Sequence, residues 1–166
     1  MMAEPVKSCD MIVNLYALPE AKPMPDGVAI ERAFAGDMRL ILTALRALAP
    51  NWADEAAVAL HQQPPTLFMA YLDGKPVGFA CYDATAKGYF GPIGLRKAAR
   101  GRHVGEALLL RTLEAMREAG YGYAVIGWAG DAAPFYQKTV NARFIEGGEP
   151  ENTVYSRQMG RQKKRG

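Results

Sequence analysis

The stretch from residue 95 to residue 109 reads Leu-Arg-Lys-Ala-Ala-Arg-Gly-Arg-His-Val-Gly-Glu-Ala-Leu-Leu, so an apolar strand leads through a basic, glycine-containing turn into a helix. Consecutive backbone N–H groups at a helix N-terminus point at one spot, and the helix dipole favours negative charge there. Gly101 and Gly105 carry no Cβ, so a ligand can approach the backbone closely. Four basic side chains surround the spot: Arg96, Lys97, Arg100 and Arg102. The pattern predicts a cradle for a diphosphate, formed by residues 100–106.

A second segment makes this interpretation more specific, because a glycine-containing turn between a strand and a helix also occurs as an ordinary connection. Residues 100–109 resemble the acetyl-CoA signature of the GNAT superfamily of N-acetyltransferases. Residues 134–144, Pro-Phe-Tyr-Gln-Lys-Thr-Val-Asn-Ala-Arg-Phe, resemble the short helix and strand that come later in that family. One position departs from the family pattern, since His103 stands where the family usually has glycine.

Composition narrows the class of protein. A chain of 166 residues with 49% hydrophobic and 22% charged residues suits one globular domain with a real core. No apolar run approaches the roughly 20 residues of a membrane span, and residues 1–7 lack the hydrophobic region of a signal peptide. We therefore expect a cytoplasmic protein that makes no membrane contact. Cys9 and Cys81 have no metal-like spacing, so we expect plain thiols, with neither a disulfide nor a metal site.

The positive net charge of +3 is concentrated at one end of the chain. The last ten residues hold five basic residues and no acidic one: Arg157, Arg161, Lys163, Lys164 and Arg165. The rest of the chain is therefore close to neutral, which argues against a nucleic-acid-binding surface. We expect residues 160–166 to form a disordered, solvated basic tail.

Hydrophobic periodicity and turn residues predict the secondary structure. An N-terminal strand (11–16) and a proline-rich crossover make up residues 1–27, and one domain occupies residues 28–159. Strands are expected at 28–34, 66–72, 76–82, 89–95, 123–127, 143–145 and 153–157. Helices are expected at 37–49, 51–63 and 102–119, with a further short helix around Pro134.

Individual residues sharpen this prediction. Asp73-Gly74 is a strong signal for a type I′ hairpin turn, and Gly91-Pro92 with Gly94 indicates a bulge or an exposed edge in the strand that enters the cradle. Asp131 is expected to cap the short helix that carries Pro134 in its first turn. Leu110 lies among the charged residues of its helix, which makes it a candidate contact in a homodimer.

Composition and periodicity alone predict only an α/β domain. The resemblance implies the GNAT fold, in which a mixed, mostly antiparallel central sheet of six to seven strands is flanked by about four helices. It also implies that two splayed strands form a wedge for coenzyme A.

The resemblance further implies roles for particular residues. The amides of Arg100, Gly101, Arg102, His103, Val104, Gly105 and Glu106 would bind the pyrophosphate of acetyl-CoA. Main-chain groups of Ile93 and Leu95 would hold the pantetheine arm and polarise the thioester carbonyl. Because a Cβ at position 103 needs a negative φ, we expect His103 to lie in the first helical turn.

Tyr136 stands where the family usually has the tyrosine that protonates the coenzyme A sulfur, although a tyrosine packed against the core would have the same pattern. The group that accepts the amine proton is left open. Four residues are candidates by type, and an ordered water chain is a further one: Glu31, His61, Asp83 and His103.

These observations predict an acetyl-CoA-dependent N-acetyltransferase that acts on a primary amine of a small molecule by direct transfer. The acceptor class stays open among antibiotics, amino sugars, polyamines and amino acids. The alternative is an acyl-CoA-binding sensor or interaction domain without transferase activity, which the unusual His103 and the missing base keep open.

Overall fold

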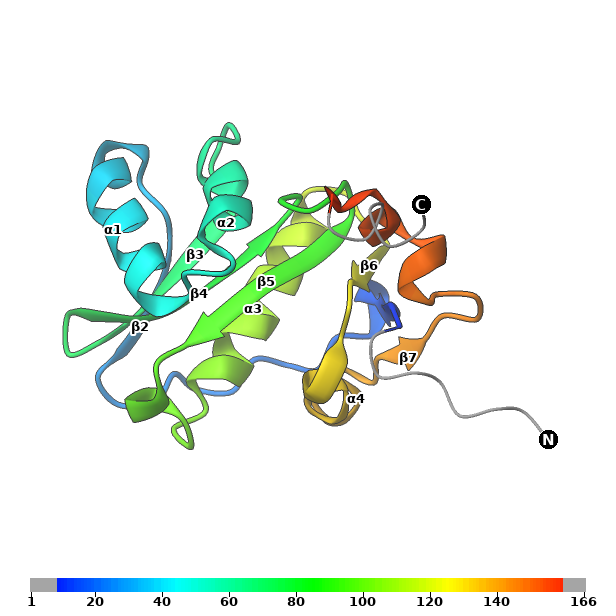
Figure 1. Ribbon diagram of the computed structural model, residues 1–166. Coiled ribbons are helices and arrows are strands. Elements are labelled where there is room, and N and C mark those ends of the chain that lie inside the picture. Colours follow the sequence, from blue (N-terminus) through cyan, green and yellow to red (C-terminus); the bar gives the residue numbers. More distant parts are fainter. Residues whose placement is uncertain (1–8, 160–166) are drawn as a thin grey trace.

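A computed structural model describes residues 9–159, which form one seven-stranded sheet with four α-helices (Figure 1). The strands are β1 (Met11–Asn14), β2 (Val28–Arg32), β3 (Leu67–Leu72), β4 (Lys75–Tyr82), β5 (Tyr89–Leu95), β6 (Tyr123–Ile126) and β7 (Arg143–Phe144). They lie in the order β2-β3-β4-β5-β6-β1-β7, and only the β5–β6 pair is parallel. This confirms the expected mixed, mostly antiparallel sheet. The basic tail expected at 160–166 lies outside the described residues.

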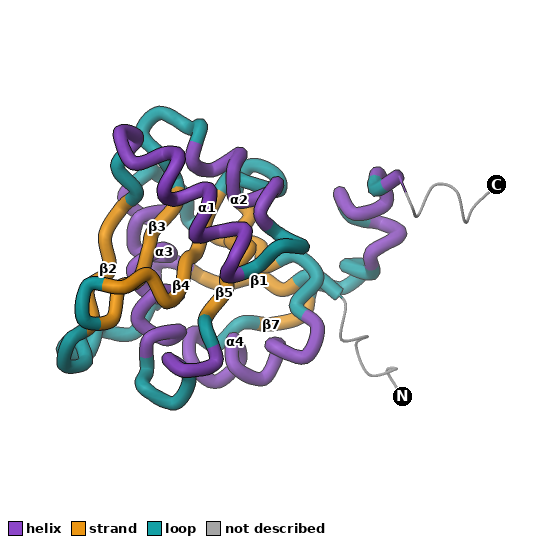
Figure 2. The backbone as a smooth tube through the Cα atoms, turned by 60° about the vertical axis from the view of Figure 1, so that its left-hand side comes forward, coloured by secondary structure: helices purple, strands orange, loops and turns teal. Residues whose placement is uncertain are grey.

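Helices cover both faces of the sheet (Figures 1 and 2). Helices α1 (Met38–Leu48) and α2 (Ala53–Leu60) pack on one face, where Leu45 and Leu60 belong to one apolar cluster. Helix α3 (Val104–Glu118) packs on the other face, and α4 (Ala133–Val140) contributes to the same second cluster. Burying one such leucine side chain contributes about 1.5 to 3 kcal/mol, so the apolar stripe of α3 fixes where the helix, and the cradle before it, sits on the sheet.

The hairpin formed by β3 and β4 confirms the sequence prediction. Asp73 and Gly74 adopt φ angles of +50° and +79°, as a type I′ turn requires at both central positions. Leu72 pairs with Lys75 directly beside the turn. A local sequence signal was sufficient here because the turn sets the pairing next to it, and the register then shifts at a bulge between Ala70 and Tyr71.

The N-terminal strand occupies a place in the sheet that the sequence did not indicate. β1 lies between β6 and β7, pairing Met11 with Ile126 on one side and with Phe144 on the other. The strand expected at 153–157 is wrong, since residues 154–157 form a 3₁₀ turn whose start is capped by Thr153 Oγ1, which accepts from the amide of Tyr155 at 3.3 Å. Because β1 pairs along both of its edges, the partner of β7 comes from the other end of the chain.

Strands β5 and β6 separate soon after they meet. They pair only at Tyr89 with Val125 and at Phe90 with Ile126, and β5 continues to Leu95 without a partner on that side among the described residues. The register of β5 on β4 also shifts between Ala80 and Tyr82. This confirms the expected splay, and it opens a gap in the middle of the sheet beside the cradle (Figure 1).

Helix boundaries differ from the expected ones by a few residues. α3 begins at Val104 rather than at 102, because His103 is not helical, and Gly120, with φ of +105°, follows its end as expected. α4 has Pro134 in its first turn as expected, but its N-cap is Ala132. Asp131 lies inside the preceding 3₁₀ turn, so the expected cap is wrong.

Candidate active site

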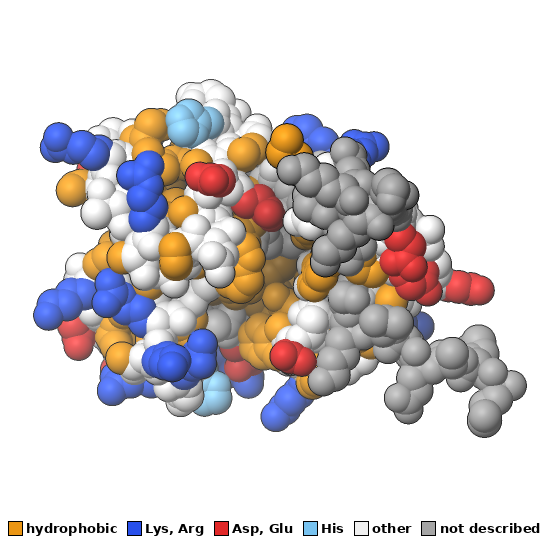
Figure 3. Space-filling view, in the orientation of Figure 1, with side chains coloured by type: hydrophobic (Ala, Val, Ile, Leu, Met, Phe, Trp, Pro, Cys, Tyr) orange, Lys and Arg blue, Asp and Glu red, His pale blue; other side chains and the backbone are white. Residues whose placement is uncertain are grey.

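A cleft of about 850 Å³ opens between the α1–α2 connection, β5, the cradle and α4. Its volume lies within the range of small-molecule sites. A hollow lined largely by hydrophobic side chains is visible in the middle of the molecular face in Figure 3. Of the residues expected to hold the cofactor, those lining the cleft are Ile93, Leu95, Arg100, Gly101, His103, Val104, Gly105 and Glu106. Arg102 is not part of the lining.

The cradle presents a run of free amides. Within residues 9–159, no backbone carbonyl accepts from the N–H groups of residues 101–106, and the first amide of the helical ladder is that of Ala107, which donates to His103 at 3.1 Å. Such groups at a helix N-terminus need outside acceptors and favour an anion. The exposed Arg96, Lys97 and Arg100 add positive charge next to them.

Gly105 faces the cleft from the first turn of α3. A Cβ built there would meet only the side chains of Leu95 and Phe135, at 3.8 and 3.9 Å, which is ordinary van der Waals contact. The protein itself therefore leaves room for a side chain at this position. The open space beside Gly105 lets a ligand lie directly against the free amides of residues 101–106. The residues present therefore fit the diphosphate of acetyl-CoA.

His103 departs from expectation in its backbone. Its φ is +62°, in the left-handed region, so the expected negative φ is wrong. The chain must reverse here to aim the following amides into the cleft, and a glycine would make this turn without a steric penalty. The imidazole is 75% exposed, and its Nδ1 lies 3.4 Å from Glu106 Oε2, so the side chain points to the rim rather than across the cradle.

We predict that His103→Gly raises the free energy of unfolding by about 1 kcal/mol, because it removes a left-handed non-glycine residue. The melting temperature should rise by about 2–4 °C, and coenzyme A affinity should change by less than about tenfold. Arg102→Gly is the matched control, since φ at Arg102 is not positive and glycine there should be destabilising. A lower stability of His103→Gly in thermal or urea unfolding would contradict the prediction.

The free edge of β5 lines the same cleft. The amide of Arg96 donates to the carbonyl of Val77 on β4 at 2.7 Å. Because hydrogen-bonding groups alternate between the two edges of a strand, the main-chain groups of Leu95 and Ile93 point away from β4. They therefore face the gap left by β6, where they are available to a ligand.

A second cavity, of about 460 Å³, lies on the other side of the gap. It extends from the same α1–α2 connection past β5 and β6 to the C-terminal 3₁₀ turn. Four residues line both this cavity and the first cleft: Asn51, Trp52, Ile93 and Ala132. The two spaces are therefore neighbours that meet between β5 and α4.

The model of the acetyltransferase (GNAT) family matches residues 32–141, about two thirds of the chain. The chain belongs to this family. Among curated protein sequences none matches significantly.

Solved structures show the same fold. The GCN5-related N-acetyltransferase from Sphaerobacter thermophilus matches with a TM-score of 0.64 at 20% identity, covering 82% of this chain and 48% of that one. A protein of the same description from Kribbella flavida matches with a TM-score of 0.56 at 18% identity, over 82% of this chain and 54% of that one. A glucosamine N-acetyltransferase region of a fungal multi-domain β-N-acetylglucosaminidase matches with a TM-score of 0.66 at 12% identity. The match covers 82% of this chain and 19% of that one. The chain thus spans about half the length of the first of these relatives.

In this GNAT domain, Tyr136 lines the second cavity while its neighbour Phe135 lines the first cleft. The Tyr136 side chain is 5% exposed, and its ring packs edge-on against Phe90 with centroids 6.2 Å apart. Burial, and then the nearby Tyr155, raise the pKa of Tyr136 to about 12. Its hydroxyl therefore stays protonated at neutral pH, which suits a proton donor.

The expected candidates for a base lie mostly elsewhere. The Asp83 carboxylate accepts from the Tyr121 hydroxyl at 2.8 Å and from the Gly88 amide at 2.8 Å, which is a structural role in the β4–β5 turn. His61 is exposed at the end of α2, and Glu31 is exposed on β2. Neither cavity is lined by any of these three, and His103 reaches only the rim of the first.

Sequence reasoning missed four of the residues that line the second cavity: Trp52, Glu55, Trp128 and Tyr155. They come from α2 and its preceding turn, from the end of β6 and from the C-terminal turn, and only the fold brings them together. A usable signal was present, because Trp52 and Glu55 are three residues apart at a helix start and so share a face.

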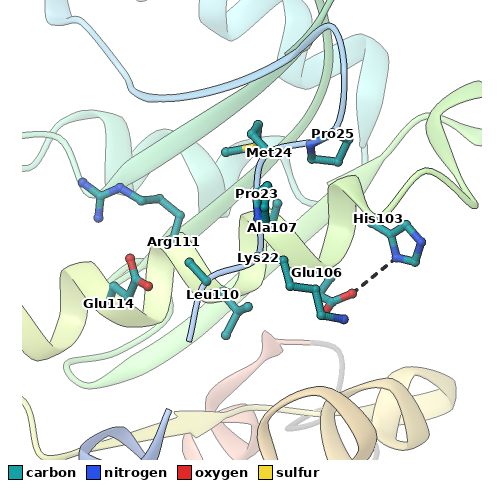
Figure 4. A pocket seen from close by; sticks show the side chains of 11 residues that line it. Lys22, Pro23, Met24, Pro25, His103, Glu106, Ala107, Leu110, Arg111 and Glu114 are labelled. Atoms are coloured by element: carbon teal, nitrogen blue, oxygen red, sulfur yellow. Dashed lines mark ion pairs between the residues drawn. The ribbon is translucent and has the colours of Figure 1, made fainter. Parts of the chain in front are cut away.

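The N-terminal crossover forms a strap over α3 next to the cradle (Figure 4). Lys22 Nζ lies 3.1 Å from Glu106 Oε1, and this hydrogen-bonded contact is the largest cause that lowers the pKa of Glu106. Leu110 lies under the strap and is only 4% exposed. It is therefore covered by its own chain, so the suggestion that it marks a homodimer contact is wrong.

Two further observations concern residues 9–159. No helix in this range is long and apolar enough to cross a membrane, and no three His, Cys, Asp or Glu side chains there gather in a way that could hold a metal ion. Cys9 and Cys81 are both buried, and they form no disulfide with each other.

Proposed function

We propose that this chain is an acetyl-CoA-dependent N-acetyltransferase that moves an acetyl group directly to a primary amine of a small molecule. The observation that carries the proposal is the run of free amides at residues 101–106 beside the unpaired edge of β5, in a chain of the GNAT family. The first cleft would hold the cofactor, and the second cavity would hold the acceptor.

Each part of the chain has a role in this proposal. The cradle amides bind the diphosphate, and charge-assisted hydrogen bonds of this kind are worth about 1.5 to 3 kcal/mol each. The edge of β5 at Ile93 and Leu95 holds the pantetheine arm, and one of its amides polarises the thioester carbonyl. Bound acetyl-CoA supplies an acyl carbon that is open to attack by an amine.

Tyr136 completes the transfer from the acceptor side. The amine would attack the acyl carbon in its neutral form. As the carbon–sulfur bond breaks, the Tyr136 hydroxyl would give its proton to the departing sulfur, and the proton released by the nitrogen would return through water to Tyr136. Positioning supplies much of the acceleration, and one proton-transfer group contributes roughly 10²- to 10⁴-fold.

A binding domain without transferase activity is the alternative. The second cavity favours a transferase, because a sensor of acyl-CoA needs no separate space that meets the cofactor cleft at its inner end. The cytoplasmic location expected from the sequence stays a prediction.

Binding of coenzyme A tests the proposal at its first step. We predict that coenzyme A and acetyl-CoA both stabilise the fold, by about 2.7 kcal/mol at a concentration 100 times the dissociation constant. A thermal shift titration measures this directly. Absence of any shift at millimolar concentrations of either ligand would overturn the proposal.

A further inference from the structure

Five aromatic side chains line the second cavity, and three of them come from segments far apart in the sequence. Trp52 comes from the α1–α2 connection, Trp128 follows β6, and Tyr155 lies in the C-terminal 3₁₀ turn. The Trp128 and Tyr155 rings meet edge to face, with centroids 5.4 Å apart and planes at 78°. Aromatic faces arranged in this way bind flat apolar groups and also attract cations.

Among the described residues that line this cavity, Glu55 has the only acidic side chain, and none of them is Lys, Arg or His. The hydroxyl of Thr85 donates to Glu55 Oε2 and so fixes the orientation of the carboxylate. Burial and then the negative charge of Glu55 raise the pKa of Tyr155 to about 12. Tyr155 therefore stays neutral and adds no second charge.

This distribution of charge separates three of the four acceptor classes that the sequence left open. An amino sugar is itself monocationic, and only the aromatic walls favour an arylalkylamine over it. A polyamine or an aminoglycoside brings several ammonium groups, and one carboxylate neutralises only one of them. An amino acid brings a carboxylate that would find no cationic partner among the lining residues and would lie near Glu55. An unpaired charge loses part of its hydration against apolar walls without gaining a partner, so each of these classes is disfavoured.

We infer that the acceptor is a monocationic amine with a flat apolar body, an arylalkylamine in chemical class, and that Glu55 selects it by pairing with its ammonium group. The inference rests on the proposed function, because it names the class of acceptor that the proposed transferase would use at the same site. The volume of about 460 Å³ fits one such molecule. Glu55 acts on acceptor binding, so its removal should raise the KM for the amine more than it lowers kcat.

Intrinsic tryptophan fluorescence can report acceptor binding without catalysis. The chain has two tryptophans, and both line this cavity. We would titrate 2-phenylethylamine, its neutral isostere 2-phenylethanol, phenylalanine and spermidine, each with and without saturating coenzyme A. We expect saturable binding, with a higher affinity for 2-phenylethylamine than for each of the other three ligands.

Variants of α2 identify the group responsible. Glu55→Gln keeps an acceptor for the Thr85 hydroxyl but removes the charge, and it should weaken 2-phenylethylamine binding by about tenfold, the worth of one charge-assisted contact. Its affinity for 2-phenylethanol should change by less than about twofold. Glu55→Asp should retain most of the amine preference. Asp54→Asn is the matched control, because it removes an exposed carboxylate next to Glu55 that lies outside the cavity, and it should bind like the wild type.

Several outcomes would overturn the inference. The first is tighter binding of spermidine or phenylalanine than of 2-phenylethylamine. The second is an equal loss of affinity for 2-phenylethylamine and 2-phenylethanol in Glu55→Gln, and the third is no fluorescence change with any amine. A coenzyme A thermal shift on the same samples separates the two proposals. A normal shift without a preference for the arylalkylamine refutes the acceptor class alone, whereas absence of the shift refutes the proposed function.

Discussion

Replacing Gly105 by valine should reduce coenzyme A affinity by at least about 100-fold while the protein stays folded. A Cβ at this position meets no atom closer than 3.8 Å within the protein, and valine is a better helix former than glycine. The added methyl groups would instead occupy the space over the free amides of the cradle. The loss of several charge-assisted hydrogen bonds then follows from displacement of the ligand.

The matched control is Ala119→Val, which places the same side chain at the exposed C-terminal end of the same helix. Isothermal titration with coenzyme A should show normal binding for this variant. Gly105→Val should have an unfolding free energy within about 1 kcal/mol of the wild type. Retention of coenzyme A affinity in Gly105→Val would mean that the ligand does not lie along the cradle.

Tyr136→Phe should lower turnover by roughly 10- to 1,000-fold and leave coenzyme A affinity nearly unchanged. Only the departing sulfur needs the hydroxyl, so the loss belongs to kcat rather than to cofactor binding. The pKa of about 12 keeps the tyrosine protonated, so its deprotonation should not shape the rate profile of the wild type below about pH 10. Steady-state kinetics with saturating acetyl-CoA would measure both effects.

Tyr123→Phe serves as the control, because Tyr123 is exposed on β6 and lines neither cavity. Its turnover should match that of the wild type. Equal turnover in Tyr136→Phe would leave Tyr136 with only its packing against Phe90.

The sequence predicted those elements that are determined by residues close together in the chain. The Asp73-Gly74 turn set the β3–β4 hairpin, and the apolar face of residues 104–116 predicted which side of α3 is buried. The sequence also indicated the cradle, because strand, basic turn and helix follow one another directly.

Non-local features were beyond such patterns. Nothing near residue 11 says that β1 pairs with both β6 and β7. Nothing in the local pattern of residues 154–157 distinguished their 3₁₀ turn from a strand. The left-handed backbone of His103 was also missed, since the prediction assumed that a Cβ excludes a positive φ. Glu55 lies far along the chain from Trp128 and Tyr155, so only the tertiary structure shows that they line one cavity.

Acetyl transfer itself is the most direct test of the proposed activity. The purified chain would be incubated with acetyl-CoA and a panel of amines, following both free thiol release and the mass of the amine product. We predict that thiol release depends on the added amine and is matched by an equal amount of N-acetylated product, with arylalkylamines foremost. Binding of acetyl-CoA with no acetylated product from any amine would contradict the proposal and favour a binding domain without transferase activity.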